Sequence, residues 1–236
     1  MIRLFLAALA AAFSLAAEAG VKIEHWVAPS GARVYFVETH VLPIIDIAVD
    51  FSAGSGQDPA DKAGLAGLAR SLLDAGAGDL DEEAISARLV DTGAKLGGMV
   101  EPDRASVTLR TLSYAAERDA ALGLMSLVLS KPNFPDAVVA REKARSIAAI
   151  QEADTKPDAI AAKRFAAAIY AGHPYGRQAT VESVGRIGRD DLVAFHRDHY
   201  SARRATVSII GDLTRAEAEK IAQTLTEGLQ IGRAHV

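Results

Sequence analysis

Two histidines at helical spacing are the side chains of this sequence that could hold a metal ion. His196 and His199 lie three residues apart with Asp198 between them, in a stretch whose pattern predicts a helix over 189–199. Imidazole and carboxylate groups that share a helix face can bind a divalent cation. A helix end in contact with water is the interpretation that we favour for this pair.

The other candidate groups are isolated in the sequence. His173 precedes a proline in a turn, where we expect a structural hydrogen bond. His25 and His40 lie on or beside early strands, where surface or edge positions are favoured. Glu142 and Glu152 fall on a long predicted helix and are expected to be solvated. The sequence has no G-x-S-x-G elbow and no P-loop, so these motifs for a serine nucleophile and for nucleotide phosphates are absent.

Composition removes several classes of function. The 236 residues carry 26 Lys and Arg against 30 Asp and Glu, which gives a formal net charge of −4 and an isoelectric point of about 5.9. Such a chain lacks a basic stripe that could neutralise phosphates, so nucleic acid is not an expected partner. There is no cysteine, which excludes disulfides, thiolate nucleophiles and Cys-ligated metals. Half of the residues are hydrophobic, as in folded chains.

The N-terminal segment is expected to be removed from the mature protein. Residues 1–19 contain one positive charge, Arg3, before an apolar run of about 14 residues, short of the roughly 20 that cross a bilayer as a helix. The segment ends in the small-x-small pattern of residues 17–19. This arrangement predicts a signal peptide, and hence a secreted protein of a bacterial periplasm without a membrane span after cleavage.

The last six residues, 231–236, look foreign to the protein. The chain stops inside a helical pattern without a cap, and the hexapeptide resembles the translation of a short-read sequencing adapter. We therefore place the folded domain at residues 20–230 and expect the natural chain to continue beyond it. His235 is given no functional weight.

Apolar periodicity predicts a mixture of strands and helices. Strands are predicted at 21–27, 33–38, 43–53, 94–100, 105–112 and 205–210. Helices are predicted at 62–75, 81–92, 114–129, 136–154, 158–170 and 189–199, and from residue 215. This order predicts an α+β domain with a mostly antiparallel sheet covered by helices on one side.

Six short motifs occur in one order over residues 21–229. They are the loop and helix Gly54-x-Gly56-x-Asp58-Pro59, Gly64-Leu65-Ala66 and Leu72-Leu73-x-x-Gly76; then Gly93 with 94–100; Leu109-Arg110-Thr111-Leu112-Ser113; Pro132-x-Phe134; Gly172-His173-Pro174-Tyr175-Gly176; and Ile210-Gly211-Asp212. Together they resemble the N-terminal half of the pitrilysin/insulinase family of zinc metallopeptidases, which carries an inverted zinc motif.

The resemblance implies a zinc site that this sequence does not preserve. Family members that cut peptides carry H-x-x-E-H on the first long helix, with two zinc-binding histidines and a glutamate that activates water, and a second glutamate about 75 residues further on. Here those positions fall on Gly67, Arg70 and Ser71, and the distal glutamate falls on Ala148 or Ala149. Glycine and alanine have no donor atom, serine is a poor neutral ligand, and arginine is a cation that repels Zn²⁺. We therefore expect neither zinc nor a catalytic base in this chain.

The resemblance also implies a peptide-binding strand. Family members hold the substrate as an added strand against an edge strand, which here comprises Lys95, Leu96, Gly97, Gly98, Met99 and Val100. Main-chain groups make those bonds, so loss of the zinc ligands need not abolish them. Gly97 and Gly98 permit a close backbone approach. The alternative is a bulged, weakly packed edge strand without a ligand.

The function that the resemblance implies is that of a non-catalytic subunit or half of a secreted metallopeptidase. Families of this kind often pair an inactive chain with an active one. We therefore expect a heterodimer with a zinc-bearing paralogue that shares a peptide substrate with this chain, the zinc being held by the partner. Two alternatives stay open: a peptide-binding scaffold without a protease partner, and an active metallopeptidase with unconventional ligands.

Overall fold

The computed structural model describes residues 21–232 of the chain. The expected signal peptide, residues 1–19, and residues 233–236 of the expected tail lie outside this described part. Within it, no helix is both long enough and apolar enough to cross a membrane.

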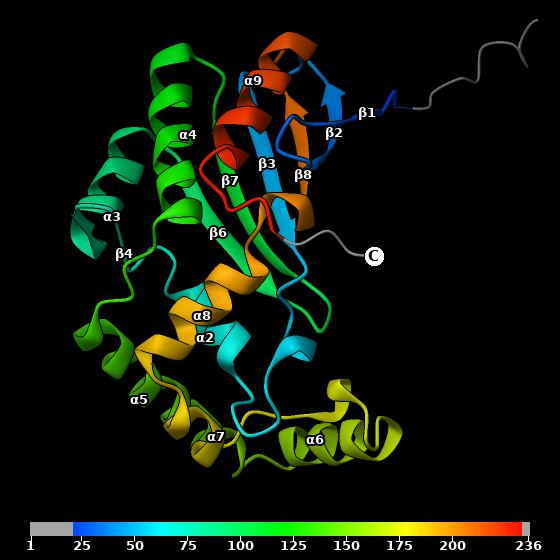
Figure 1. Ribbon diagram of the computed structural model, residues 1–236, viewed down its shortest axis with the longest axis vertical. Coiled ribbons are helices and arrows are strands. Elements are labelled where there is room, and N and C mark those ends of the chain that lie inside the picture. Colours follow the sequence, from blue (N-terminus) through cyan, green and yellow to red (C-terminus); the bar gives the residue numbers. More distant parts are fainter. Residues whose placement is uncertain (1–20, 233–236) are drawn as a thin grey trace, which may run out of the picture.

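A six-stranded sheet runs through the domain in the order β1-β2-β8-β3-β7-β6 (Figure 1). Its strands are β1 (Glu24–Val27), β2 (Arg33–Glu38), β3 (Ile44–Phe51), β6 (Lys95–Val100), β7 (Ala105–Leu112) and β8 (Ala205–Gly211). Neighbouring strands are antiparallel except β2 and β8, which are parallel. The mostly antiparallel sheet is thus confirmed, and β1 and β6 form its two edges.

Helices α4 and α9 pack on each other and lie over one face of the sheet (Figure 1), which confirms the α+β class. The helices are α2 (Leu65–Ser71), α3 (Glu82–Asp91), α4 (Ala115–Ser130), α5 (Asp136–Ala153), α6 (Pro157–Ile169), α7 (Val181–Arg186), α8 (Arg189–His199) and α9 (Arg215–Thr226). Short 3₁₀ turns are η1 (Ser55–Gln57), η2 (Pro174–Gly176) and η3 (Ala202–Arg204).

Alternation along the strands explains why one face is covered. Ile45, Ile47, Val49 and Phe51 of β3 are buried, whereas the residues between them are partly exposed. Strand β8 shows the same pattern. Because successive side chains of a strand point to opposite faces, one face of the sheet is apolar and packs under the helices.

Helix α2 lies at one end of the sheet, in contact with β6, β7 and α8. The buried carboxylate of Asp58 fixes its first turn, because it accepts hydrogen bonds from the amides of Gly64 and Ala66, each at 2.8 Å. Burial raises the pKa of Asp58, and the two amide bonds oppose that rise. The loop before α2 therefore sets the direction in which this helix presents its side chains.

The first helix is shorter than the sequence predicted. Instead of 62–75 it spans Leu65–Ser71, because Gly64 has a φ of +103°, which no helical residue adopts. Leu72 and Leu73 follow the helix and are still fully buried, so their apolar spacing reflected the core and not the helix. The helix α7 and the two-stranded β4 (Gly76–Ala77) and β5 (Leu80–Asp81) were not predicted.

Candidate peptide-binding site

Arg70 takes the place of the catalytic base on α2, and its side chain faces the sheet. Only 7% of the residue is exposed. Its Nε donates to the carbonyl of Ser106 on β7 at 2.8 Å, and one terminal nitrogen donates to the carbonyl of Gly97 on β6. Arg70 thus joins α2 to the last two strands of the sheet.

Burial lowers the pKa of Arg70, and the nearby carboxylate of Asp74 acts in the opposite direction. An arginine side chain keeps its proton in proteins even so. A fixed positive charge therefore lies where a catalytic member of the family would need a carboxylate beside a metal ion.

The contact with Arg70 leaves no room for a side chain at position 98. A Cβ atom on Gly98 would lie 2.6 Å and 2.7 Å from two guanidinium nitrogens of Arg70 and would also overlap the carbonyl of Ser106. The residue has a φ of +147°, which residues with a side chain rarely adopt. The glycine in β6 is thus required by the contact with α2.

The positions of the zinc motif do not fit a zinc ion. Gly67 has no side chain, and apart from its chain neighbours and the backbone of its own helix no atom lies within 4 Å of where its Cβ would be. The hydroxyl of Ser71 donates to the carbonyl of Leu68 at 3.1 Å. Ala148 and Ala149 are exposed on α5 and offer no donor atom. Among residues 21–232, no three His, Cys, Asp or Glu side chains come together in a way that could hold a metal ion.

A cavity of about 380 Å³ separates α2 and α3 from α5, with Ser71 on one wall and Glu142 on another. Glu142 is paired with Arg141 at 3.0 Å and with Arg145 at 3.8 Å, and Arg141 also holds Glu82 of α3 at 2.9 Å. The side chain of Glu142 is only 18% exposed, so the expectation that it is solvated was wrong.

The neighbouring helices explain the difference: Glu142 lines a cavity that α3 also walls, and the sequence pattern of α5 alone does not show which helix packs beside it. Glu152, about two helical turns beyond the last α5 residue that lines this cavity, fits the expectation: it is exposed and pairs with Lys156 at 2.7 Å.

The predicted peptide-binding strand lies at the edge of the sheet. Strand β6 pairs with β7 on one side only, in a register that sets Gly97 beside Thr108. Met99 is 60% exposed. An edge strand of this kind has unpaired main-chain groups that an extended peptide can use. The position of the strand is as expected, and peptide binding there stays a prediction.

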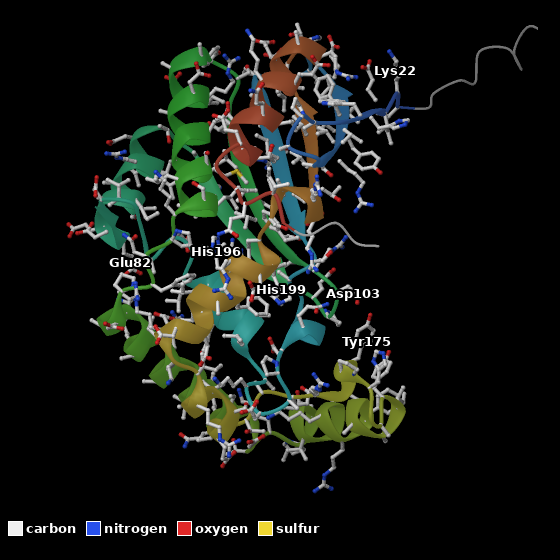
Figure 2. The ribbon with its side chains drawn as sticks, viewed as in Figure 1. Lys22, Glu82, Asp103, Tyr175, His196 and His199 are labelled. Carbon is white, nitrogen blue, oxygen red and sulfur yellow. The ribbon has the colours of Figure 1, made fainter. Side chains whose placement is uncertain are left out.

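The histidine pair of α8 is packed, not solvated (Figure 2). His196 lies 2.9 Å from the carbonyl of Leu129 through Nε2 and stacks on Tyr200. His199 packs on Phe195. Burial lowers the pKa of both histidines. The solvated interpretation was wrong because α8 is covered by neighbouring elements, and the pair is a part of that packing.

The turn histidine behaves as expected. Nδ1 of His173 accepts a hydrogen bond from the amide of Tyr175 at 3.2 Å. The hydroxyl of Tyr175 donates to Asp103 in the β6–β7 turn, which places η2 beside this turn (Figure 2). The turn therefore ties the segment after α6 to the end of the candidate strand.

His40 has charged partners that the sequence reading missed. Its ring nitrogens lie 2.6 Å from Asp212 and 2.9 Å from Glu38. These carboxylates raise the pKa of His40. Glu38 stands two residues before it, at the end of β2, and was a visible signal, whereas Asp212 is 172 residues away. His25 stacks against Tyr35.

This fold, with an exposed edge strand beside a helix that carries none of the zinc ligands of the motif, defines a domain of the inverted-zinc-motif peptidases. The model of the insulinase family, peptidase family M16, matches residues 33–181, and the model described as the peptidase M16 inactive domain matches residues 186–232. The chain belongs to peptidase family M16.

Known proteins similar to this chain are longer than it. A crystal structure of a peptidase M16 inactive domain from Pseudomonas fluorescens has 33% sequence identity and a TM-score of 0.88, and the match covers 91% of this chain and 52% of that chain. A Helicobacter pylori protein named non-peptidase homolog YmxG is 26% identical over 81% of this chain and 43% of its own length. A probable mitochondrial-processing peptidase subunit beta from Schizosaccharomyces pombe is 24% identical over 75% of this chain and 39% of its own length. The chain thus spans about half, or less, of the length of these relatives.

Proposed function

We propose that this chain is a non-catalytic M16 subunit, or half of one, that presents β6 to an extended peptide and supports proteolysis by a zinc-bearing partner. The observation that carries the proposal is the position of Arg70. Its guanidinium stands in place of the catalytic base and bonds to the carbonyls of Gly97 and Ser106. The residue that removes the metal chemistry is the same residue that supports the peptide-binding strand.

Loss of the chemistry follows from the residue types at the motif. Hydrolysis in this family needs a metal-bound water and a general base. Gly67, Ser71 and the alanines of α5 supply neither, and Arg70 cannot accept a proton. The relative from Helicobacter pylori, named a non-peptidase homolog, supports this conclusion.

Pairing with an active chain is the second part of the proposal. The relative from Schizosaccharomyces pombe is named as a subunit of a peptidase, which supports a role within an assembly. We place the assembly in a bacterial periplasm on the pattern of residues 1–19. N-terminal sequencing of the protein from a periplasmic extract tests the location, and a retained Met1 contradicts it.

The proposal is tested with the purified chain, fluorescein-labelled casein peptides and hydrogen exchange. The peptides should slow exchange at the amides of β6 and leave the opposite edge strand, β1, unchanged. The chain alone should show no cleavage that EDTA abolishes. Adding a co-purified M16 paralogue with an intact H-x-x-E-H motif should produce such cleavage.

Each other outcome has a definite meaning. Chelator-sensitive cleavage by the chain alone overturns the non-catalytic assignment and favours a metallopeptidase with unconventional ligands. Protection of β6 without any zinc-bearing paralogue in the co-purified material contradicts the subunit role and favours a peptide-binding scaffold. Equal exchange at β6 with and without peptide removes the docking site.

A further inference from the structure

Strand β6 presents three different residue types on one face of its free edge. Side chains alternate along a strand, so Lys95, Gly97 and Met99 point to the same face of the sheet. Gly98 belongs to the other face, where a Cβ would meet the guanidinium of Arg70. The side chains of a docked peptide that point away from α2 therefore meet a lysine, a glycine and a methionine.

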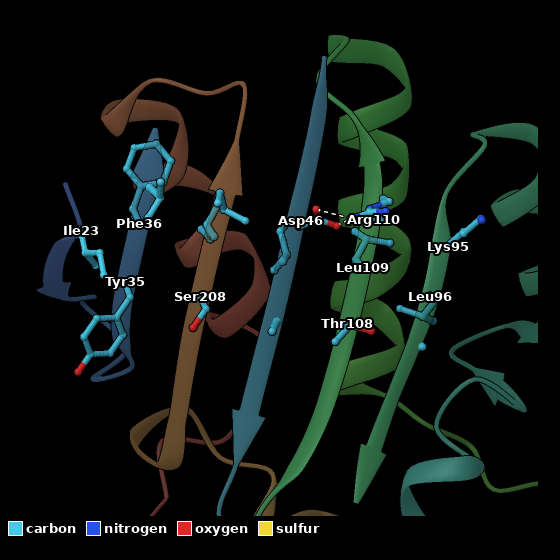
Figure 3. Close-up of a pocket in the computed structure, with 16 residues that line it drawn as sticks. Ile23, Tyr35, Phe36, Asp46, Lys95, Leu96, Thr108, Leu109, Arg110 and Ser208 are labelled. Atoms are coloured by element: carbon cyan, nitrogen blue, oxygen red, sulfur yellow. Dashed lines mark hydrogen bonds and ion pairs between the residues drawn. The ribbon is translucent and has the colours of Figure 1, made fainter. Parts of the chain in front are cut away.

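A row of charges across three strands is incomplete at Lys95. The register places Asp46, Arg110 and Lys95 side by side on β3, β7 and β6. Arg110 binds Asp46 through two hydrogen bonds, of 2.6 and 2.8 Å. Lys95 thus has a cation on its β7 side, and its side chain points away from Arg110, beyond the edge of the sheet (Figure 3).

Lys95 forms no ion pair or side-chain hydrogen bond with any residue in the range 21–232. Like charges that stand opposite each other on neighbouring strands repel, whereas opposite charges attract. A carboxylate is therefore the group that fits the free side of Lys95, because it continues the row with the opposite sign.

Gly97 leaves a gap in the same surface. Its neighbours across the sheet are Thr108 on β7 and Ala48 on β3, which both have short side chains. Apart from its chain neighbours, a Cβ at Gly97 would meet only the hydroxyl of Thr108, at 3.4 Å. An aromatic side chain on an adjacent strand can cover a glycine of this kind. The position opposite Gly97 therefore fits an aromatic residue.

Met99 has an apolar surface that β7 does not cover. The residue is 60% exposed. Its partner on β7 is Ser106, whose hydroxyl donates to Asp50 of β3. A thioether side chain is flexible and packs against apolar groups of different shapes. An aliphatic residue opposite Met99 would bury this surface.

We propose that the peptide bound at β6 runs antiparallel to the strand and carries an aliphatic, an aromatic and an acidic residue at alternate positions, in this order from its N-terminal end. They lie opposite Met99, Gly97 and Lys95. The β6–β7 and β3–β7 ladders are antiparallel, and antiparallel pairing is the more stable kind. The inference rests on the proposed function, because it names the class of peptide that the same strand accepts.

Two peptides of identical composition test this order. The first contains leucine, phenylalanine and glutamate in sequence, separated and flanked by threonines, and the second contains them in reverse. Both carry fluorescein on an N-terminal glycine linker, and fluorescence anisotropy measures their affinity for the purified chain. The first should bind at least about fivefold more tightly, because the second sets leucine opposite Lys95 and glutamate opposite Met99. Hydrogen exchange verifies that each peptide binds at β6.

A charge exchange assigns the effect to Lys95. Lys95→Glu should weaken binding of the first peptide about fivefold, and replacing the glutamate of the peptide by lysine should restore it. Lys220→Glu is the matched control, because it changes an exposed lysine of α9 by the same charge. It should leave both affinities unchanged.

Gly97→Thr is a second, independent variant. Its side chain occupies the space above the strand, so it should weaken binding of the first peptide and leave unchanged the affinity of a peptide with threonine in place of phenylalanine.

Equal affinity of the two peptides, or tighter binding of the reversed one, overturns the inference; slowed exchange at β6 then still supports the proposed function. An equal loss of affinity in Lys220→Glu and Lys95→Glu also overturns it, because net charge and not position then decides. If neither peptide slows exchange at β6, the docking site itself is wrong, and the inference and the proposed function fail together.

Discussion

The guanidinium of Arg70 lies over Gly98, so that a Cβ on this glycine would approach two of its nitrogens to 2.6 and 2.7 Å. Each residue constrains the other. The guanidinium of Arg70 can reach the carbonyls of Gly97 and Ser106 because position 98 has no side chain. A Cβ at that position would overlap the guanidinium in its present place. The edge strand is therefore adapted to an arginine and not to a metal centre.

Gly98→Ala should destabilise the domain by about 2 kcal/mol or more, because the new methyl group meets backbone and Arg70 at a φ that favours glycine. Urea unfolding followed by circular dichroism measures the change. Gly67→Ala is the matched control: its Cβ meets nothing within 4 Å on an exposed part of α2. This change should stabilise the domain by about 0.5–1 kcal/mol. Unchanged stability of the Gly98→Ala variant would show that β6 is not confined by Arg70.

Arg70→Met keeps much of the apolar length of the side chain and removes both hydrogen bonds. The carbonyls of Gly97 and Ser106 then lose a charged donor in a largely buried position, at a cost of about 1–3 kcal/mol. We expect hydrogen exchange to become faster in β6, while β1 at the far edge keeps its rate. Arg70→Lys should recover part of the protection, since it can still donate to one carbonyl. Equal exchange in β6 for all three proteins contradicts a supporting role for this side chain.

The sheet and the candidate strand could be predicted because their signals are local. Alternation of Ile45, Ile47 and Val49 marks β3 without any knowledge of its neighbours. The two glycines of β6 and the altered zinc motif are visible as residue types. What the sequence could not supply is the contact between them: Arg70 and Gly97 are 27 residues apart, and only the fold brings them together.

The features that the sequence did not predict depend mostly on contacts between segments that are far apart in the chain. The parallel pairing of β2 with β8 joins residues 173 positions apart, as Arg33 and Thr206 show. The contact between His196 and the carbonyl of Leu129 joins residues 67 positions apart. Helix α7 has only six residues and is fixed by a capping box between Thr180 and Ser183, too little for a periodic pattern.

The pKa values of two histidines should be shifted in opposite directions. Asp212 and Glu38 raise the pKa of His40 above its usual 6.5, whereas burial lowers the pKa of His196 below it. The His40 contacts therefore stabilise the fold fully below pH 6.5, and this stabilisation is lost as the pH rises through the folded-state pKa. For His196 the sign reverses: stability falls as the pH drops below 6.5 towards its lowered folded-state pKa.

An NMR titration of the imidazole carbon-bound protons measures both values. Asp212→Asn should move the midpoint of His40 down towards 6.5 and leave that of His196 in place, since Asp212 contacts only the first. A common midpoint for both histidines would contradict the contacts described.

Restoring the zinc motif is the most demanding test of the coordination argument. The variant Gly67→His, Arg70→Glu, Ser71→His with a glutamate at Ala148 should bind zinc, because Gly67 faces open space and Ser71 is exposed, so two histidines at i and i+4 can project together. A parallel variant with the glutamate at Ala149 decides which alanine stands at the distal position. Equilibrium dialysis with metal analysis measures the zinc, and the thermal midpoint should rise with zinc concentration.

The matched control for this variant keeps Arg70 and carries the other three substitutions. Its fixed cation should repel Zn²⁺ and hold β6 as in the natural chain, so weak or no zinc binding is expected. Because both proteins offer the same two histidines and the same distal glutamate, a difference between them isolates the arginine. Equal zinc affinity would show that missing ligands alone, and not the charge of Arg70, account for the lost site.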